Sequence, residues 1–151
     1  MRPVLFQKVT IIGVGLLGGS LGLAIKQRQL AARTAGYVRR AASVSECQQF
    51  AVVDQATRDI KQAVDGADLV VLCTPLSRMR ALTEEILPVL KQGTIVTDVG
   101  SVKGSVVAEL EQLVAGAGAH FIGSHPMAGG EKMGVSAART DLFQNAVCVV
   151  T

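Results

Sequence analysis

Short apolar runs alternate with amphipathic stretches along the whole chain. Most of the runs lack the apolar–polar alternation of a half-exposed strand, which is typical of parallel strands buried on both faces. We predict strands over residues 9–14, 34–38, 67–73, 94–98, 121–122 and 145–150, with a weaker one at 52–53. Helical spacing predicts helices over residues 16–28, 60–64, 76–90 and 102–115, a short one that ends at residue 50, and at most a short one within 129–139.

This order predicts an α/β fold with a doubly wound, mostly parallel sheet, because right-handed crossovers place helices on both faces of such a sheet. The length of 151 residues fits one domain, and no repeat or linker divides it. Ligands of these sheets bind outside the carboxyl ends of the strands. Candidate chemistry is therefore expected in the segments that follow the predicted strands.

Composition narrows the function classes. The net charge of +3 is small and scattered, and aromatic residues make up only 3%, so we expect no nucleic-acid partner. Seventeen uncharged residues separate Lys8 from Lys26, but five of them are glycines, so we predict a ligand-binding turn and no membrane segment. Cys47, Cys73 and Cys148 are far apart, which predicts no disulfide and no metal site. We interpret them as small core residues of a cytoplasmic protein.

Gly13, Gly15 and Gly18 form a GxGxxG pattern between the first predicted strand and the first predicted helix. Gly13 permits a tight turn, Gly15 lets the backbone approach a pyrophosphate, and Gly18 allows close packing of helix and strand. The N–H groups at the helix start, around Leu16 and Leu17, would face the negative charge. We predict a Rossmann-type dinucleotide-binding domain; the alternative is a turn whose glycines serve packing alone.

The segment after the second predicted strand bears on which dinucleotide binds. NAD-binding domains usually carry an acidic residue there for the ribose hydroxyls, but this chain has Val38, Arg39 and Arg40, with no carboxylate before Glu46. An arginine in this position can bind a 2′-phosphate. We predict that NADP is preferred and that NAD is possible; a pair of solvated surface arginines is the alternative.

Two more predicted strands end where a nicotinamide would lie. Thr74 and Pro75 follow one of them, and they either stop the strand or form a rigid wall beside the nicotinamide ribose. Gly100 and Ser101 follow the next, and Ser101 either caps a helix or directs its hydroxyl toward a substrate. Lys103 is interpreted as a solvated helix residue.

His125 is the strongest candidate for catalysis. It follows the short strand at 121–122, lies between Ser124 and Pro126, and is one of only two histidines in the chain. An imidazole titrates near neutral pH and suits general acid–base work. A structural role for a single loop histidine is the alternative.

Four segments together are similar to one enzyme family. The stretches GVGLLGGSLGLA, DLVVLCTP, TDVGSVK and SHPMAGGEKMGVSAARTDLF resemble the N-terminal cofactor domain of the prephenate/arogenate dehydrogenases of tyrosine biosynthesis. The HPMAG block with its downstream DLF is specific, whereas the glycine pattern is shared by many oxidoreductases. The resemblance covers essentially all 151 residues.

The resemblance implies an NAD(P)-dependent oxidative decarboxylation of prephenate or arogenate, with no metal. It implies that His125 assists deprotonation of the substrate hydroxyl and that Ser101 orients that hydroxyl and the histidine. Glu131 matches an acidic residue near the mouth of the site with a gating role, and Ser124 is a further candidate for contact with substrate.

The family also has a C-terminal helical domain that dimerises, closes the cleft and supplies an arginine for the substrate carboxylate. None of it is present here, and Thr151 directly follows a predicted strand, so we expect a fragment that binds cofactor with little turnover. Two alternatives remain: another dehydrogenase on this fold, of the β-hydroxyacid or pyrroline-carboxylate reductase type, and a non-catalytic dinucleotide sensor.

Overall fold

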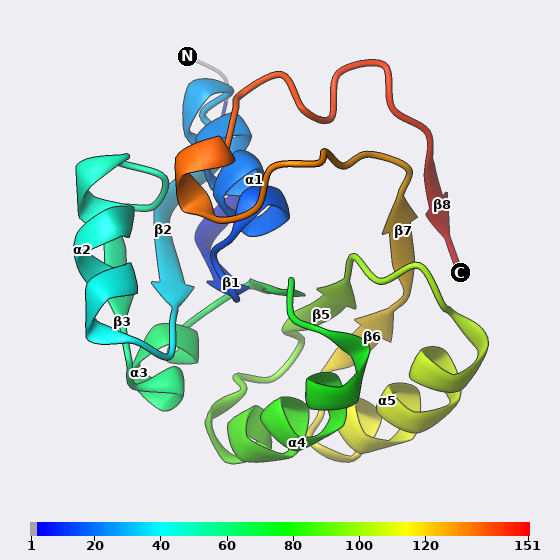
Figure 1. The fold of residues 1–151 in the computed structure, drawn as a ribbon. Helices are drawn as coiled ribbons and strands as arrows, with labels where there is room; N and C mark the ends of the chain where they lie inside the picture. Colours follow the sequence, from blue (N-terminus) through cyan, green and yellow to red (C-terminus); the bar gives the residue numbers. More distant parts are fainter. Residues whose placement is uncertain (1–2) are drawn as a thin grey trace.

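The computed structural model describes residues 3–151 (Figure 1). The elements in chain order are β1 (Phe6–Ile12), α1 (Leu16–Gln27), β2 (Ala31–Tyr37), α2 (Ala41–Gln49), β3 (Gln55–Thr57), α3 (Ile60–Val64), β4 (Leu69–Leu72), α4 (Leu76–Ile86), the 3₁₀ turn η1 (Leu87–Val89), β5 (Ile95–Asp98), α5 (Gly104–Gly116), β6 (His120–Ile122), β7 (Ser124–Pro126), the 3₁₀ turn η2 (Val135–Ala137) and β8 (Cys148–Val150).

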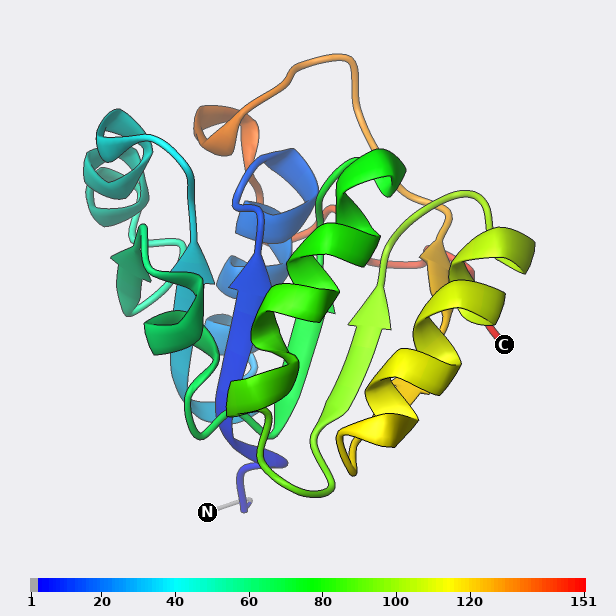
Figure 2. The ribbon, with the colours of Figure 1, turned by 90° about the horizontal axis from the view of Figure 1, so that it is seen from below.

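Six parallel strands form the main sheet in the order β3-β2-β1-β4-β5-β6. The predicted doubly wound α/β fold is therefore confirmed. The chain order reverses direction between β1 and β4, and this switch point is where such sheets bind ligands. Figure 2 shows the strands side by side, with the segment between β7 and η2 arching beyond their carboxyl ends.

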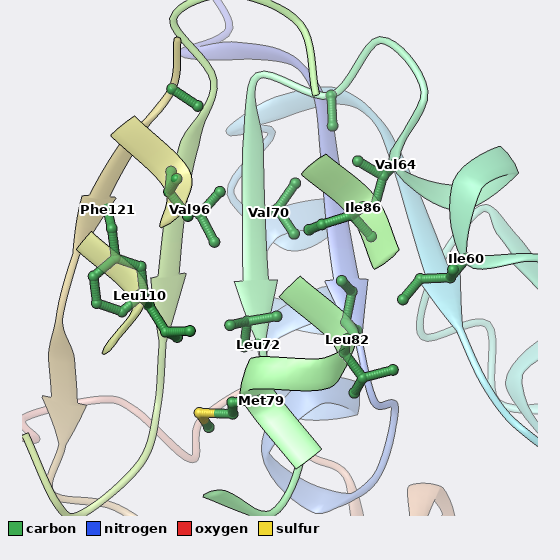
Figure 3. Packing of buried hydrophobic residues seen from close by; sticks show 14 of the residues in the cluster. Ile60, Val64, Val70, Leu72, Met79, Leu82, Ile86, Val96, Leu110 and Phe121 are labelled. Atoms are coloured by element: carbon green, nitrogen blue, oxygen red, sulfur yellow. The ribbon is translucent and has the colours of Figure 1, made fainter. Parts of the chain in front are cut away.

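Each face of the sheet has its own apolar core. The larger core packs α3, α4 and α5 against the strands and includes Leu72, Met79, Ile86 and Leu110, which are at most 2% exposed (Figure 3). A second core on the opposite face lies under α1, α2 and η2. The aliphatic runs of the strands are buried on both faces because helices cover both faces.

Among the predicted bounds that differ from the structure, two have a clear physical reason. The weak strand placed at 52–53 lies instead at β3, because Val52 and Val53 are buried under the helices while pairing with β2 starts at Gln55. The helix predicted to reach residue 90 ends at Ile86 and continues as η1, since Pro88 has no N–H to donate to the preceding turn.

The last strand differs more from its prediction. A strand was predicted over residues 145–150, but the observed strand, β8, covers only Cys148–Val150. It pairs antiparallel with β7 in a separate two-stranded sheet, with His125 opposite Val149. Ala146 and Val147 precede it in a loop, after a backbone turn at Asn145 with a φ of +59°. The interpretation of Cys148 as a core residue was wrong because its strand lies at the surface. Cys47, on α2, is buried.

Within residues 3–151, no helix combines the length and the apolar character needed to cross a membrane.

Candidate cofactor-binding and catalytic site

A pocket of about 310 Å³ opens at the carboxyl ends of β1, β2 and β4. Seven of the predicted cofactor residues line it: Gly13, Gly15, Val38, Arg39, Arg40, Thr74 and Pro75. Leu16, Leu17, Gly18 and Gly100 were also predicted and are not among its lining residues. Sequence reasoning missed four polar residues of the lining, namely Tyr37, Ser43, Ser77 and Arg78.

The glycine turn brings β1, β2 and β4 together at the floor of the pocket. The Gly13 amide donates to the Tyr37 carbonyl at 3.0 Å, and Gly13 has a φ of +92°. A Cβ on Gly13 would lie 2.8 Å from the Cys73 carbonyl oxygen, and one on Gly18 would lie 2.2 Å from the Gly13 carbonyl oxygen. A Cβ on Gly15 would meet nothing within 4 Å, so the space beside Gly15 is open to a ligand.

Helix α1 begins directly after this turn with unsatisfied N–H groups. Its N-cap, Gly15, offers no side-chain acceptor, and its first turn has no acidic residue. The amides of Leu16, Leu17 and Gly18 precede the first intrahelical bond, which the Gly19 amide makes to the Gly15 carbonyl at 2.8 Å. These amides and the helix dipole suit a pyrophosphate.

The β2 side of the pocket is basic. Val38 is buried in the core, whereas Arg39 and Arg40 are exposed, and no carboxylate lines the pocket. The Arg58 side chain donates from Nε to the Arg39 carbonyl at 3.0 Å and so fixes the backbone there. This lining suits a phosphate more than a bare ribose diol.

The β4 side of the pocket contains an unpartnered polar atom. The Thr74 hydroxyl oxygen is buried and makes no hydrogen bond to any of residues 3–151. A buried polar group without a partner is costly, so this hydroxyl fits one that bonds a ligand. Burial raises the pKa of the neighbouring Cys73 thiol to about 12, with the Asp98 charge adding to the shift, so this thiol stays protonated at neutral pH.

Asp98 connects the ends of β5 and β6. Its carboxylate is fully buried and accepts hydrogen bonds from the Gly100 amide at 2.9 Å and the Ser124 amide at 3.2 Å. It also pairs with Lys103, whose Nζ donates to the Ser124 carbonyl at 2.8 Å. The Gly100–Ser101 loop and the start of β7 are thereby held to one carboxylate.

One interpretation of this loop was wrong, and one of the two alternatives for Ser101 is excluded. Lys103 is not solvated: its side chain is only 15% exposed because it points to Asp98. Ser101 does not cap a helix, since α5 begins at Gly104 with Lys103 as its N-cap. Ser101 is exposed near the sheet edge. The carboxylate of Asp98, at the end of a buried strand, requires a charged or hydrogen-bonding partner. This requirement could have identified Lys103 from the sequence.

His125 lies on β7, half-buried, and its imidazole makes no hydrogen bond to any of residues 3–151. The segment that follows it returns to the glycine turn. A Cβ on Gly130 would lie 3.5 Å from Leu16 Cδ2, and the Arg139 amide donates to the Ser20 hydroxyl at 3.0 Å. η2 packs on α1 accordingly (Figure 1). The segment that follows His125 therefore packs on α1 beside the cofactor turn, whereas His125 itself is not among the residues that line the pocket.

Ser124 and Glu131 occupy different surroundings. The Ser124 hydroxyl donates to the Asp98 carbonyl at 2.5 Å, and Ser124 borders a second, mainly apolar cavity of about 270 Å³ between α1 and the sheet. This ties Ser124 to the scaffold. Glu131 is exposed on the loop after β7 and lines neither the pocket beside the glycine turn nor this second cavity.

Comparisons with known proteins identify the family of this chain. The family model of the prephenate dehydrogenase nucleotide-binding domain matches residues 21–151. A prephenate dehydrogenase from Lactococcus lactis is 38% identical over 96% of this chain and 41% of its own length. A cyclohexadienyl dehydrogenase from Zymomonas mobilis is 35% identical over 97% of this chain and 49% of its own length.

Solved structures indicate the same family. Prephenate dehydrogenase from Aquifex aeolicus, in complex with hydroxyphenyl propionate and NAD+, has a TM-score of 0.89 at 30% identity, over 99% of this chain and 52% of that one. Synechocystis arogenate dehydrogenase has a TM-score of 0.87 at 33% identity, over 95% and 49%. This chain thus spans about half the length of these relatives, and it belongs to the prephenate dehydrogenase family as a nucleotide-binding domain.

Proposed function

We propose that this chain is the cofactor-binding and histidine-bearing part of an NAD(P)-dependent dehydrogenase that oxidatively decarboxylates prephenate or arogenate. The observation that carries the proposal is the shared region at the carboxyl edge of the sheet. There the segment from His125 to Arg139 leaves β7 and packs back onto α1 and its glycine turn. A dehydrogenase needs such an arrangement, because the proton acceptor must reach the hydroxyl of the same carbon that gives its hydride to the nicotinamide.

The turn from Gly13 to Gly18 would hold the dinucleotide, which when bound would supply the acceptor for the hydride from C4 of the cyclohexadienol. His125 takes the proton of the C4 hydroxyl as that carbon becomes a carbonyl carbon. The bond from the ring to its carboxylate breaks, carbon dioxide leaves, and the bonding pair completes the aromatic ring, whose oxygen recovers a proton. Ser101, on the loop tied to Asp98, orients the hydroxyl. Asp98 and Lys103 fix the two segments that carry Ser101 and His125.

The remaining half of the enzyme belongs to the same proposal. The relatives are about twice as long as this chain, so a further domain would close the substrate pocket and pair two subunits into a dimer. The experiment that tests the proposal is dinucleotide-dependent turnover of prephenate and of arogenate by the full-length gene product. Production of 4-hydroxyphenylpyruvate or tyrosine supports it, and absence of both products contradicts it.

Replacing the histidine tests the mechanism separately. In the full-length enzyme, His125→Asn should lower kcat by about 10²–10⁴-fold, the contribution of a general base, and leave cofactor affinity nearly intact. Steady-state kinetics and a cofactor titration measure the two quantities. An unchanged kcat would remove His125 from proton transfer even if the enzyme turns over prephenate.

The cofactor is proposed to be NADP in preference to NAD. The pocket supports this because Arg39 and Arg40 line it and no carboxylate does. Arg39→Ala should weaken the binding of NADP by roughly tenfold or more, because one charged hydrogen bond is lost. The affinity for NAD should change little. Titration of both cofactors into wild type and variant measures the difference. An equal loss for both, or no NADP preference in the wild type, contradicts the proposal.

A further inference from the structure

A third arginine faces the pocket from the opposite side. Arg39 and Arg40 follow β2, whereas Arg78 lies in the first turn of α4, after β4. β2 and β4 flank β1 on its two sides, so the three side chains border one pocket from both of its walls. All three arginines are exposed.

These guanidinium groups have no internal counterion. Within residues 3–151, none of the three forms an ion pair, and the pocket lining contains no aspartate or glutamate. Another arginine of α4 does have an internal counterion, since Arg80 pairs with Glu84 at 3.0 Å. Cations gathered around one pocket repel each other, and an anion bound among them would remove that repulsion.

The lining indicates which anion fits. Ser43, at the start of α2, adds a hydroxyl to the β2 side of the pocket. A guanidinium group matches two oxygens of a phosphate at once. The glycine turn at the other end of the pocket suits a pyrophosphate, so the arginines stand where the adenosine ribose of the same dinucleotide would lie.

We infer that Arg78, together with Ser43, completes a subsite for the 2′-phosphate of a dinucleotide and thereby sets the cofactor preference. The inference rests on the proposed cofactor site. It differs from the assignment to Arg39 and Arg40 in that recognition spans both walls of the pocket. Removal of the α4 arginine alone should then erase the preference.

Two small nucleotides test the subsite without the nicotinamide. Adenosine 2′,5′-bisphosphate and adenosine 5′-monophosphate differ only in the 2′-phosphate, and calorimetric titration of the full chain gives both affinities. Wild type should bind the bisphosphate more tightly than the monophosphate. Arg78→Ala should weaken bisphosphate binding by roughly 10- to 100-fold and change the affinity for the monophosphate little. Arg80→Ala, two residues away on the same helix and likewise exposed, is the matched control and should keep the preference. Circular dichroism checks that both variants fold.

The outcomes separate the inference from the proposal beneath it. An Arg78→Ala variant that keeps the wild-type preference, or that loses both nucleotides equally, overturns the inference and leaves dinucleotide binding in place. The same holds if Arg80→Ala has an equal effect. If wild type binds neither nucleotide, nor NADP or NAD, the proposed cofactor site and the inference both fail.

Discussion

Gly13 and Gly15 stand two residues apart in one turn, and the missing side chain serves a different purpose in each. At Gly13 the protein itself needs the space, because φ is +92° and a Cβ would lie 2.8 Å from a backbone oxygen. At Gly15 no protein atom lies within 4 Å of the Cβ position. The two glycines therefore allow folding and ligand binding to be examined separately.

Gly15→Ala should leave the free energy of unfolding almost unchanged and weaken dinucleotide binding by roughly 5- to 150-fold, the cost of overpacking a close contact. Gly13→Ala should instead lower the free energy of unfolding by about 1–3 kcal/mol through strain and the clash with Cys73. Urea denaturation and cofactor titration of both variants measure the two effects. Tight cofactor binding by Gly15→Ala would place the pyrophosphate elsewhere.

Helix α1 shows how packing outweighs helix propensity. Gly22 lies inside the helix, where alanine would be favoured by about 1 kcal/mol. A Cβ on Gly22, however, would lie 2.2 Å from the Val52 carbonyl oxygen, because the helix lies directly on the segment that enters β3. The glycine thus sets the distance between α1 and that segment.

Gly22→Ala should destabilise the fold by about 1–3 kcal/mol in spite of its better propensity. Gly104→Ala is the matched control at the start of α5, where a Cβ would meet nothing within 4 Å, and it should be neutral or stabilising by up to about 1 kcal/mol. Chemical denaturation compares them. Equal stability of both variants would mean that α1 can shift without cost.

The elements predicted from the sequence are those whose pattern is local. The buried strands β1, β4 and β5 are rich in aliphatic residues, and any parallel fold places their carboxyl ends at one edge. Gly13, Thr74 and Gly100 could therefore be assigned to that edge. β8 could not be assigned to its sheet, because a valine-rich strand looks alike in a central sheet and in a surface hairpin. Only its pairing with β7 distinguishes the two.

The candidate site was predictable where it follows strands and not where it depends on helices. Arg39 and Arg40 follow the end of β2, and His125 comes shortly after the end of β6, and all three were predicted from these positions. Arg78 was missed because its approach to the pocket depends on where α4 lies against the sheet. Lys103 was misread because α5 begins two residues later than its apolar spacing suggests, which leaves the lysine at the sheet edge.

At the scale of the whole molecule, one buried ion pair joins the two sheets. Asp98 ends β5 of the main sheet, and Ser124 begins β7 of the second sheet. Lys103 contacts both through the Asp98 carboxylate and the Ser124 carbonyl. The position of the hairpin that carries His125 therefore depends on a charge that water does not reach, since Asp98 is fully buried.

Lys103→Met should lower the free energy of unfolding by about 3–5 kcal/mol, because it leaves the Asp98 carboxylate buried without its counterion. Arg139→Ala is the control: its pair with Asp141 is more than half exposed on both sides, so its loss should cost about 0–1 kcal/mol. Denaturant unfolding of wild type and both variants measures the difference. In the full-length enzyme, Lys103→Met should also lower kcat with little change in cofactor affinity, since the pocket at β2 and β4 does not include Lys103. If Lys103→Met were as stable as Arg139→Ala, the hairpin would be held by its backbone hydrogen bonds, and Asp98 would not be the link between the two sheets.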